Sequence, residues 1–236
     1  MSAPLSQGRH LGHLAGSQTV ESMPERHAIY YAPARHSALD TLSTRWLARA
    51  ELAALTVSAR HYGFHATIKA PMALKTGAKV ADLVAELKSW CAKEAPVTVG
   101  RVELRLLDGF IALVPAAQTD DLTNFAGRVV EAFDRFRAPL DAKERAKRLS
   151  APLTDRQIKL VDRYGYPYVM EQFQFHMTLT DRLPPAQSAK VLAEARNFFA
   201  VALGAPLVLD RLVLFHESAS RAPFTRGAEF MLQGGI

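Results

Sequence analysis

An internal repeat is the feature of this sequence that most constrains its fold. Residues 96–104 (PVTVGRVEL) align with residues 206–214 (PLVLDRLVL): the Pro, the Arg and the final Leu are identical, and most other positions share polar or apolar character. Both segments are typical of β-strands, and helical patterns precede them at about 80–93 and 186–201. Upstream of each helix lies a predicted strand with a His-x-Thr motif. The chain therefore contains two copies of one unit.

The two His-x-Thr motifs occupy equivalent places in the two copies. His65 precedes Pro96 by 31 residues, and His176 precedes Pro206 by 30. A His followed two residues later by Ser or Thr is common by chance, so the matching position is what gives these motifs weight.

A third motif of this kind, His216-Glu217-Ser218, lies at the end of a different predicted strand and aligns with Leu106 of the first copy. We interpret His216 as structural or peripheral.

The repeat predicts a first lobe at about 26–118 and a second at about 119–236, with an insertion of one or two short helices at about 137–165. Residues 1–25 carry Gly, Ser, Gln and His without periodicity, which predicts a flexible N-terminal extension. Further predicted elements are a strand at 27–32, helices at 37–50 and 123–136, and closing strands at 110–114 and 224–232.

Both motifs sit in strands of alternating character. Side chains two residues apart share a face of a strand, so His65, Thr67 and Lys69 are predicted to point the same way. In the second strand, Gln172, Gln174, His176, Thr178 and Thr180 form one face, and Phe173, Phe175, Met177 and Leu179 form the other. Such a polar face on a central strand predicts a wet cleft.

Two imidazoles and two hydroxyls that face each other across a cleft suit in-line displacement at phosphorus. One neutral histidine would take a proton from the attacking water, and the other, protonated, would give one to the leaving oxygen. Histidine fits both roles because its pKa lies near neutral pH. The alternative is that His65 and His176 are merely hydrogen-bonded strand residues.

The length and composition of the chain indicate what class of protein it is. With 236 residues and 49% hydrophobic content the chain can bury a sizeable core, and no apolar run is long enough for a membrane span. We therefore expect a soluble, cytoplasmic protein. The single Cys91 rules out an internal disulfide and is predicted to lie in the core.

The net charge of +6 favours anionic partners. The densest basic stretch, residues 143–148 (KERAKR), fits either a solvated helix face or an anion-steering patch.

Several chemistries lack the residues they need. There is no Walker-type loop, no G-x-G-x-x-G and no G-x-S-x-G, so nucleotide-triphosphate, dinucleotide and acyl-enzyme chemistry have no support. Neither histidine strand has a His-x-His or an acid on the same face, which disfavours a metal site. We expect no cofactor and no metal.

At these residues the sequence resembles the 2H phosphoesterase superfamily, whose members carry two H-x-[ST]-h motifs in which h is hydrophobic. The motifs here are residues 65–68 (HATI) and 176–179 (HMTL). Residues 26–33, 62–71 and 165–180 resemble one branch, the phosphonate metabolism proteins with domain of unknown function 1045. The resemblance covers about residues 26–233.

The resemblance implies an α+β fold with two pseudo-symmetric lobes, in which antiparallel sheets face each other across a central cleft with helices outside. It also implies metal-independent hydrolysis or transesterification of cyclic phosphates or 2′-5′ phosphodiesters, and a link to phosphonate breakdown. By motif position, His65 and His176 become the acid/base pair, and Thr67 and Thr178 the phosphate-binding residues.

The expected substrate is a small phosphorylated sugar or nucleotide, with RNA as a further candidate; neither a membrane nor an obligate protein partner is expected. Further candidates for substrate binding are Lys69 and four tyrosines, Tyr30, Tyr62, Tyr166 and Tyr168, although core or loop packing is the alternative for the tyrosines. The competing function classes are a non-catalytic RNA- or nucleotide-binding module and an RNA ligase-type transesterase.

Overall fold

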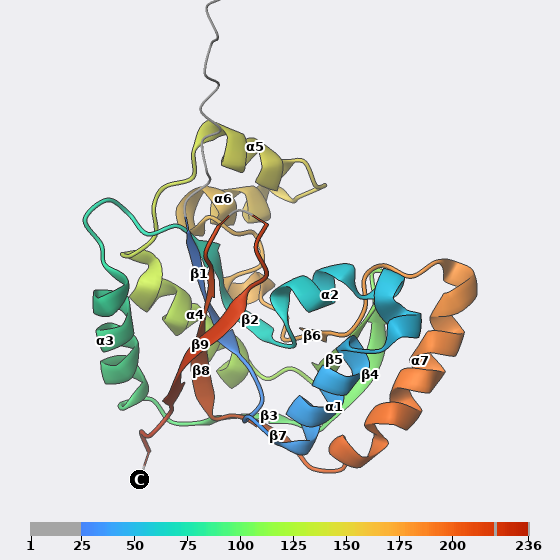
Figure 1. The fold of residues 1–236 in the computed structure, drawn as a ribbon. Helices are drawn as coiled ribbons and strands as arrows, with labels where there is room; N and C mark the ends of the chain where they lie inside the picture. Colours follow the sequence, from blue (N-terminus) through green and yellow to red (C-terminus); the bar gives the residue numbers. More distant parts are fainter. Residues whose placement is uncertain (1–24, 220, 236) are drawn as a thin grey trace, which may run out of the picture.

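The computed structural model describes residues 25–219 and 221–235, so the predicted N-terminal extension lies, except for Glu25, outside the described residues. A seven-stranded antiparallel sheet with the order β4-β5-β6-β2-β1-β8-β9 forms the centre, and β3 and β7 form a second small sheet (Figure 1). The α+β class with antiparallel sheets is confirmed. The strands are β1 (Arg26–Tyr31), β2 (Ala66–Met72), β3 (Val97–Gly100), β4 (Val102–Leu107), β5 (Phe110–Pro115), β6 (Met177–Thr178), β7 (Leu207–Leu209), β8 (Arg211–Glu217) and β9 (Thr225–Met231).

All helices of the described residues except α2, which the sequence did not predict, lie within a few residues of their predicted places. The helices are α1 (Ala38–Leu47), α2 (Val57–Tyr62), α3 (Val80–Cys91), α4 (Asp120–Asp134), α5 (Ala142–Leu149), α6 (Asp155–Tyr164) and α7 (Pro185–Phe199), with 3₁₀ turns η1 (Ala50–Leu55), η2 (Met170–Gln172) and η3 (Ala200–Ala202). Across the described part of the chain, none of these helices has the length and apolar character needed to cross a membrane.

The repeat is visible in the structure. Each of the two aligned segments, predicted as one strand, divides into two at the same place. Gly100, at φ +84°, ends β3 before β4 begins, and Asp210 separates β7 from β8. The two short first halves, β3 and β7, pair with each other, whereas β4 and β8 join the main sheet.

The two copies share one sheet. The histidine strands β2 and β6 are neighbours at its centre, with Ala66 opposite Met177. On one side β6 pairs with β5, which pairs with β4, and on the other side β2 is followed by β1, β8 and β9. The structure thus differs in one respect from the expected pair of facing sheets, because the backbones of β2 and β6 pair with each other and join the lobes.

The main core lies between one face of the sheet and helices α1, α3, α4 and α7. Strand residues contribute to it in alternation, as Ile29 and Tyr31 of β1 do. Cys91 is 1% exposed within this core, as predicted. The intervening residues Ala28 and Tyr30 belong to a second, smaller cluster on the opposite face. That opposite face is the one that carries the histidines.

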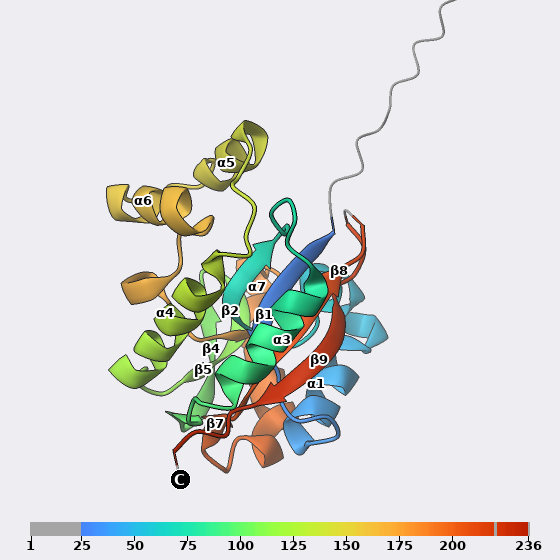
Figure 2. The ribbon, with the colours of Figure 1, turned by 90° about the vertical axis from the view of Figure 1, so that its left-hand side faces the viewer.

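The segment predicted as an insertion contains α5 and α6. These helices lie together beyond one end of the sheet, next to the ends of β1 and β2 (Figures 1 and 2). A capping box begins each of them: Asp141 with Glu144 for α5, and Thr154 with Gln157 for α6.

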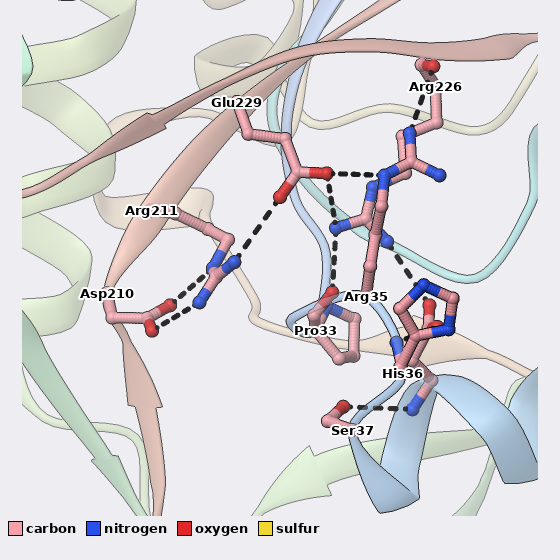
Figure 3. Close-up of polar contacts among 9 residues, drawn as sticks. Pro33, Arg35, His36, Ser37, Asp210, Arg211, Arg226 and Glu229 are labelled. Carbon is pink, nitrogen blue, oxygen red and sulfur yellow. Dashed lines mark hydrogen bonds and ion pairs between the residues drawn. The ribbon is translucent and has the colours of Figure 1, made fainter.

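A network of charges ties the edge strand β9 to the loop that follows β1 (Figure 3). The carboxylate of Glu229 accepts from Arg35 at 2.9 Å and pairs with Arg226 at 3.1 Å and Arg211 at 3.3 Å. Arg226 also donates to the Pro33 carbonyl at 2.7 Å and to Asp40 at 3.2 Å. These contacts join residues about 190 positions apart in the chain.

Candidate active site

The antiparallel pairing of β2 with β6 brings the two His-x-Thr motifs together. Because Ala66 lies opposite Met177, the same register places His65 opposite Thr178 and Thr67 opposite His176. Ala66 and Met177 are both fully buried in the helix-covered core. The two histidines and two threonines therefore share the other face of the sheet, related by an approximate twofold axis.

The two imidazoles are held in the same way. The Nδ1 of His65 lies 2.9 Å from the carbonyl oxygen of Gly63, and the Nδ1 of His176 lies 2.9 Å from that of Gln174. A carbonyl oxygen only accepts, so each ring carries a proton on Nδ1. In the neutral form each Nε2 is therefore the basic atom. The Thr67 hydroxyl donates to the Nε2 of His65 at 3.1 Å.

His65 sits in an apolar surrounding. The ring of Tyr30 stacks on it with centroids 3.7 Å apart, and the ring of Phe215 lies 6.0 Å away. Removal from water lowers the pKa of His65 to about 4; the nearby His176 acts in the same direction, and the hydrogen bond to Gly63 opposes it. His65 is therefore neutral at pH 7.

Gly63 positions the carbonyl that holds His65. It ends α2 with φ +73° and ψ 174°, a conformation in which residues with a Cβ are strained. This backbone conformation lets the chain turn from α2 into β2 with the Gly63 oxygen within reach of the His65 ring.

The strand predicted at residues 172–180 is shorter than expected. The side chain of Gln118 forms the hydrogen bonds that a neighbouring strand would otherwise form with its backbone. The Gln118 amide donates to the Phe173 carbonyl at 2.7 Å, and the Gln118 side-chain oxygen accepts from the Phe175 N–H at 2.7 Å. Only Met177 and Thr178 are left as β6. The predicted apolar face is confirmed, since its four residues are all buried: Phe173, Phe175, Met177 and Leu179.

Thr180 departs from the predicted polar face. It is fully buried, and its hydroxyl accepts from the Ile111 N–H of β5 at 2.9 Å. A threonine whose hydroxyl is satisfied by backbone can be buried at little cost, so alternation alone did not reveal its place.

Lys69 departs from the predicted face as well. Thr67 pairs with Tyr30 and Lys69 with Ile29, so the register shifts by one residue between them. This irregularity turns Lys69 away from the His65 face. Its Nζ donates to Asp134 at 3.0 Å and to the Val130 carbonyl at 3.2 Å, and the residue is 3% exposed. Lys69 thus holds α4 against β2, in place of the direct phosphate contact considered for it.

Two adjoining cavities flank the histidine strands. The first, here the histidine cavity, has a volume of about 1010 Å³ and is lined by Thr67 and His176. The second, here the α5 cavity, has a volume of about 340 Å³ and is lined by Tyr62 and Lys69. Tyr166 and Tyr168 border both cavities.

The four candidate tyrosines separate into two groups. Tyr62 and Tyr166 are half-buried, Tyr168 is exposed, and all three line a cavity. Tyr30 is 1% exposed and packs against His65, so it has no face left for a base or a sugar. For Tyr30 the packing alternative is therefore the correct one.

The structure also adds residues that the sequence did not indicate. Gln118 and Asp134 fix the histidine strands through contacts with distant segments, and Arg182 lines the histidine cavity. No local pattern marks Gln118, because its partners lie more than fifty positions away. His216 lies near the end of β8 opposite His27, at the periphery as predicted. Within residues 25–219 and 221–235, no three His, Cys, Asp or Glu side chains are grouped to hold a metal ion.

Comparison with known proteins identifies similar sequences. The family model described as "Protein of unknown function (DUF1045)" matches residues 67–225. A ribose 1,5-bisphosphate phosphokinase PhnN from Janthinobacterium sp. (strain Marseille) is 35% identical over 91% of this chain and 52% of its own length. The protein of the same name from Laribacter hongkongensis (strain HLHK9) is 32% identical over 84% of this chain and 50% of its own.

The chain thus spans about half the length of the curated relatives it matches. Among solved structures, the conserved protein of unknown function ATU0111 from Agrobacterium tumefaciens str. C58 superposes with a TM-score of 0.42 at 13% identity. That superposition covers 87% of this chain and 86% of the other.

Proposed function

Because this chain belongs to the DUF1045 family of proteins of unknown function, we propose a function for it from its site: metal-independent hydrolysis of a small cyclic phosphodiester. The observation that carries the proposal is the matched pair of imidazoles. Both are fixed through Nδ1 to a carbonyl two residues earlier, so in both rings Nε2 is the nitrogen that can transfer a proton; that of His65 accepts from the Thr67 hydroxyl until substrate takes its place. A module that only binds would not need two titratable rings held alike, so this geometry favours catalysis over binding.

The proposed reaction is one in-line displacement at phosphorus. His65, neutral because burial lowers its pKa to about 4, accepts a proton from the attacking water on Nε2. The water oxygen forms a bond to phosphorus while the bond to one ring oxygen of the cyclic diester breaks. Protonated His176 gives its Nε2 proton to that departing oxygen. The product is a phosphomonoester with a free hydroxyl.

Thr67 and Thr178 are proposed to hold the non-bridging oxygens. Each threonine lies across the β2–β6 pair from the histidine of the other motif, so one phosphate at the centre would lie within reach of both hydroxyls. Donors aimed at these oxygens stabilise the charge that builds up on them in the transition state.

The names of the relatives suggest the substrate. They are named as kinases of ribose 1,5-bisphosphate and are about twice the length of this chain, which has no Walker-type loop. We assign the kinase activity to the other half of those proteins. One cyclic diester that yields ribose 1,5-bisphosphate on hydrolysis is the five-membered cyclic phosphate that joins the neighbouring O1 and O2 of ribose 5-phosphate. We propose this compound as the substrate, in phosphonate catabolism.

The test is turnover of the cyclic ribose phosphate in EDTA, followed by ³¹P NMR. His65→Ala and His176→Ala should each lower kcat at least about a hundredfold, as expected when one acid or base is lost. His216→Ala removes the histidine of the third motif, His216-Glu217-Ser218, and should leave kcat unchanged. Unchanged turnover in both site variants would exclude the mechanism, and a product esterified to an added alcohol instead of water would indicate a transesterase.

A further inference from the structure

The α5 cavity is strongly basic, and the reaction proposed above uses none of its charges. Five of the six charged residues that line it are cations, and α5 contributes two of the five. The six are Arg26, Lys69, Arg137, Glu144, Lys147 and Arg148.

Three of the cations are already paired with carboxylates. Arg26 donates to the buried Glu217 at 2.5 Å, and both Lys69 and Arg137 bind Asp134, at 3.0 and 2.8 Å. Lys147 and Arg148 form no ion pair with a carboxylate in the described part of the chain. Glu144, the one acid that lines the cavity, accepts from the Asp141 N–H in the capping box of α5, so the cations outnumber the nearby carboxylates.

The contacts of α5 place the Arg148 guanidinium at the wall of this cavity, and Lys147 lines the same cavity. Arg145, on the same helix, forms a bidentate pair with Asp162 of α6 and anchors α5. The guanidinium carbon of Arg148 lies 5.4 Å from the centre of the Tyr166 ring. Tyr166 also lines the histidine cavity, so Arg148 contacts a ring that borders both cavities. The basic stretch is therefore divided between an anchor and a cavity wall.

We propose that Lys147 and Arg148 form a second anion subsite, which binds a phosphomonoester group of the substrate remote from the reacting phosphorus. This inference rests on the proposed function, since it assigns the two ends of one substrate to the two cavities. A guanidinium offers two parallel N–H donors to phosphate oxygens, and the lysine adds a flexible ammonium. Tyr62 and Tyr166 line the same cavity, and we assign them the contacts to the connecting sugar.

The kinetic test compares two substrates that differ only in the remote group. These are the 1,2-cyclic phosphates of ribose with and without a 5-phosphate. Arg148→Gln and Lys147→Gln should each raise KM for the 5-phosphorylated compound about tenfold or more, because each removes a charge-assisted contact. KM for the compound without the 5-phosphate should not change. Lys143→Gln removes the same charge from an exposed position of α5 that does not line the cavity, and should behave as wild type.

A binding measurement separates this inference from the proposed reaction. Ribose 5-phosphate is titrated into wild type, His65→Ala and Arg148→Gln in a calorimeter. The subsite predicts equal affinity for wild type and His65→Ala, and at least about tenfold weaker binding for Arg148→Gln. This result would support the subsite even if neither cyclic phosphate were hydrolysed. Equal binding by all three proteins, or an equal effect of Arg148→Gln on both substrates, would overturn it. Lys147→Gln serves in both assays if Arg148→Gln does not fold.

Discussion

The rings of Tyr30 and His65 lie 3.7 Å apart and within 17° of parallel. Tyr30 is on β1, where it pairs in register with Thr67, so the strand next to β2 supplies the wall behind the catalytic candidate. This wall keeps water from one face of the imidazole, and desolvation is the largest cause of the low pKa of His65. Tyr30 thus contributes to the desolvation that keeps His65 neutral, although Tyr30 lines neither cavity.

Replacement of Tyr30 tests this relationship. Tyr30→Phe keeps the stacked ring, so the pKa of His65 should stay near 4. Tyr30→Ala opens a cavity, which should cost about 3–5 kcal/mol of stability and admit water, so the pKa should rise toward about 6.5. The measurement is a ¹H NMR titration of the His65 ring in both variants. A pKa that is the same in the two would mean that the stack does not set it.

Stability should depend on pH through the same histidine. The pKa of His65 is lower in the folded protein than in the unfolded chain, so the unfolded chain binds more protons between about pH 6.5 and pH 4. The contribution of His65 is therefore complete above about pH 6.5 and is lost as the pH falls to 4, by at most about 3 kcal/mol. Urea unfolding at pH 7.5 and pH 4.5 should show a smaller loss in His65→Gln than in wild type. Burial of His27 lowers its pKa too and contributes equally to both proteins.

Gln118 should act on His176 without contact with it. Gln118→Ala leaves the Phe173 carbonyl and the Phe175 N–H without their partner, at a cost of about 1–3 kcal/mol. The segment that presents the Gln174 carbonyl to His176 then loosens, and kcat should fall about tenfold or more. Gln187→Ala is the control, because it removes an exposed glutamine side chain of α7 that does not line the histidine cavity. Equal activity of the two variants would contradict a positioning role for Gln118.

Gly63 should resist substitution because of its backbone. Gly63→Ala forces a Cβ onto a residue with φ +73°, which should cost about 1–3 kcal/mol and displace the carbonyl that orients His65. Gly204→Ala is the control, since a Cβ there meets no atom within 4 Å. Thermal unfolding and turnover of the two variants give the comparison. If Gly63→Ala were as stable and active as Gly204→Ala, the turn after α2 would not need glycine.

The repeat and the strand alternation made the centre of the site predictable from sequence. Alternation depends only on neighbours within one strand, and the repeat only on comparing one copy with the other along the sequence; the residues that alternation placed on the apolar faces, such as Ala66 and Met177, are buried. The features that the sequence did not indicate depend on contacts between residues that lie far apart in the chain. The shift in register that turns Lys69 away from His65 arises where β2 meets β1, and the burial of Thr180 depends on a donor from β5.

Gln118 illustrates the same limit. A single glutamine replaces two backbone hydrogen bonds of the segment before β6, so a predicted nine-residue alternating strand becomes a two-residue strand. Alternation reports which side chains are buried, and here it did so correctly. It does not report which group satisfies the backbone, which depends on the tertiary structure.

The charges on β9 also determine how that edge strand aligns with the sheet. Glu229 lies beside Val213 on one face, and its neighbour Phe230 is buried in the helix-covered core on the other. If β9 slipped by one residue, Glu229 would take the place of Phe230, and a carboxylate that now binds three arginines would lie unpaired among apolar side chains. The charge network therefore favours the observed register of β9, because a shift by one residue in either direction would place the Glu229 carboxylate on the apolar face.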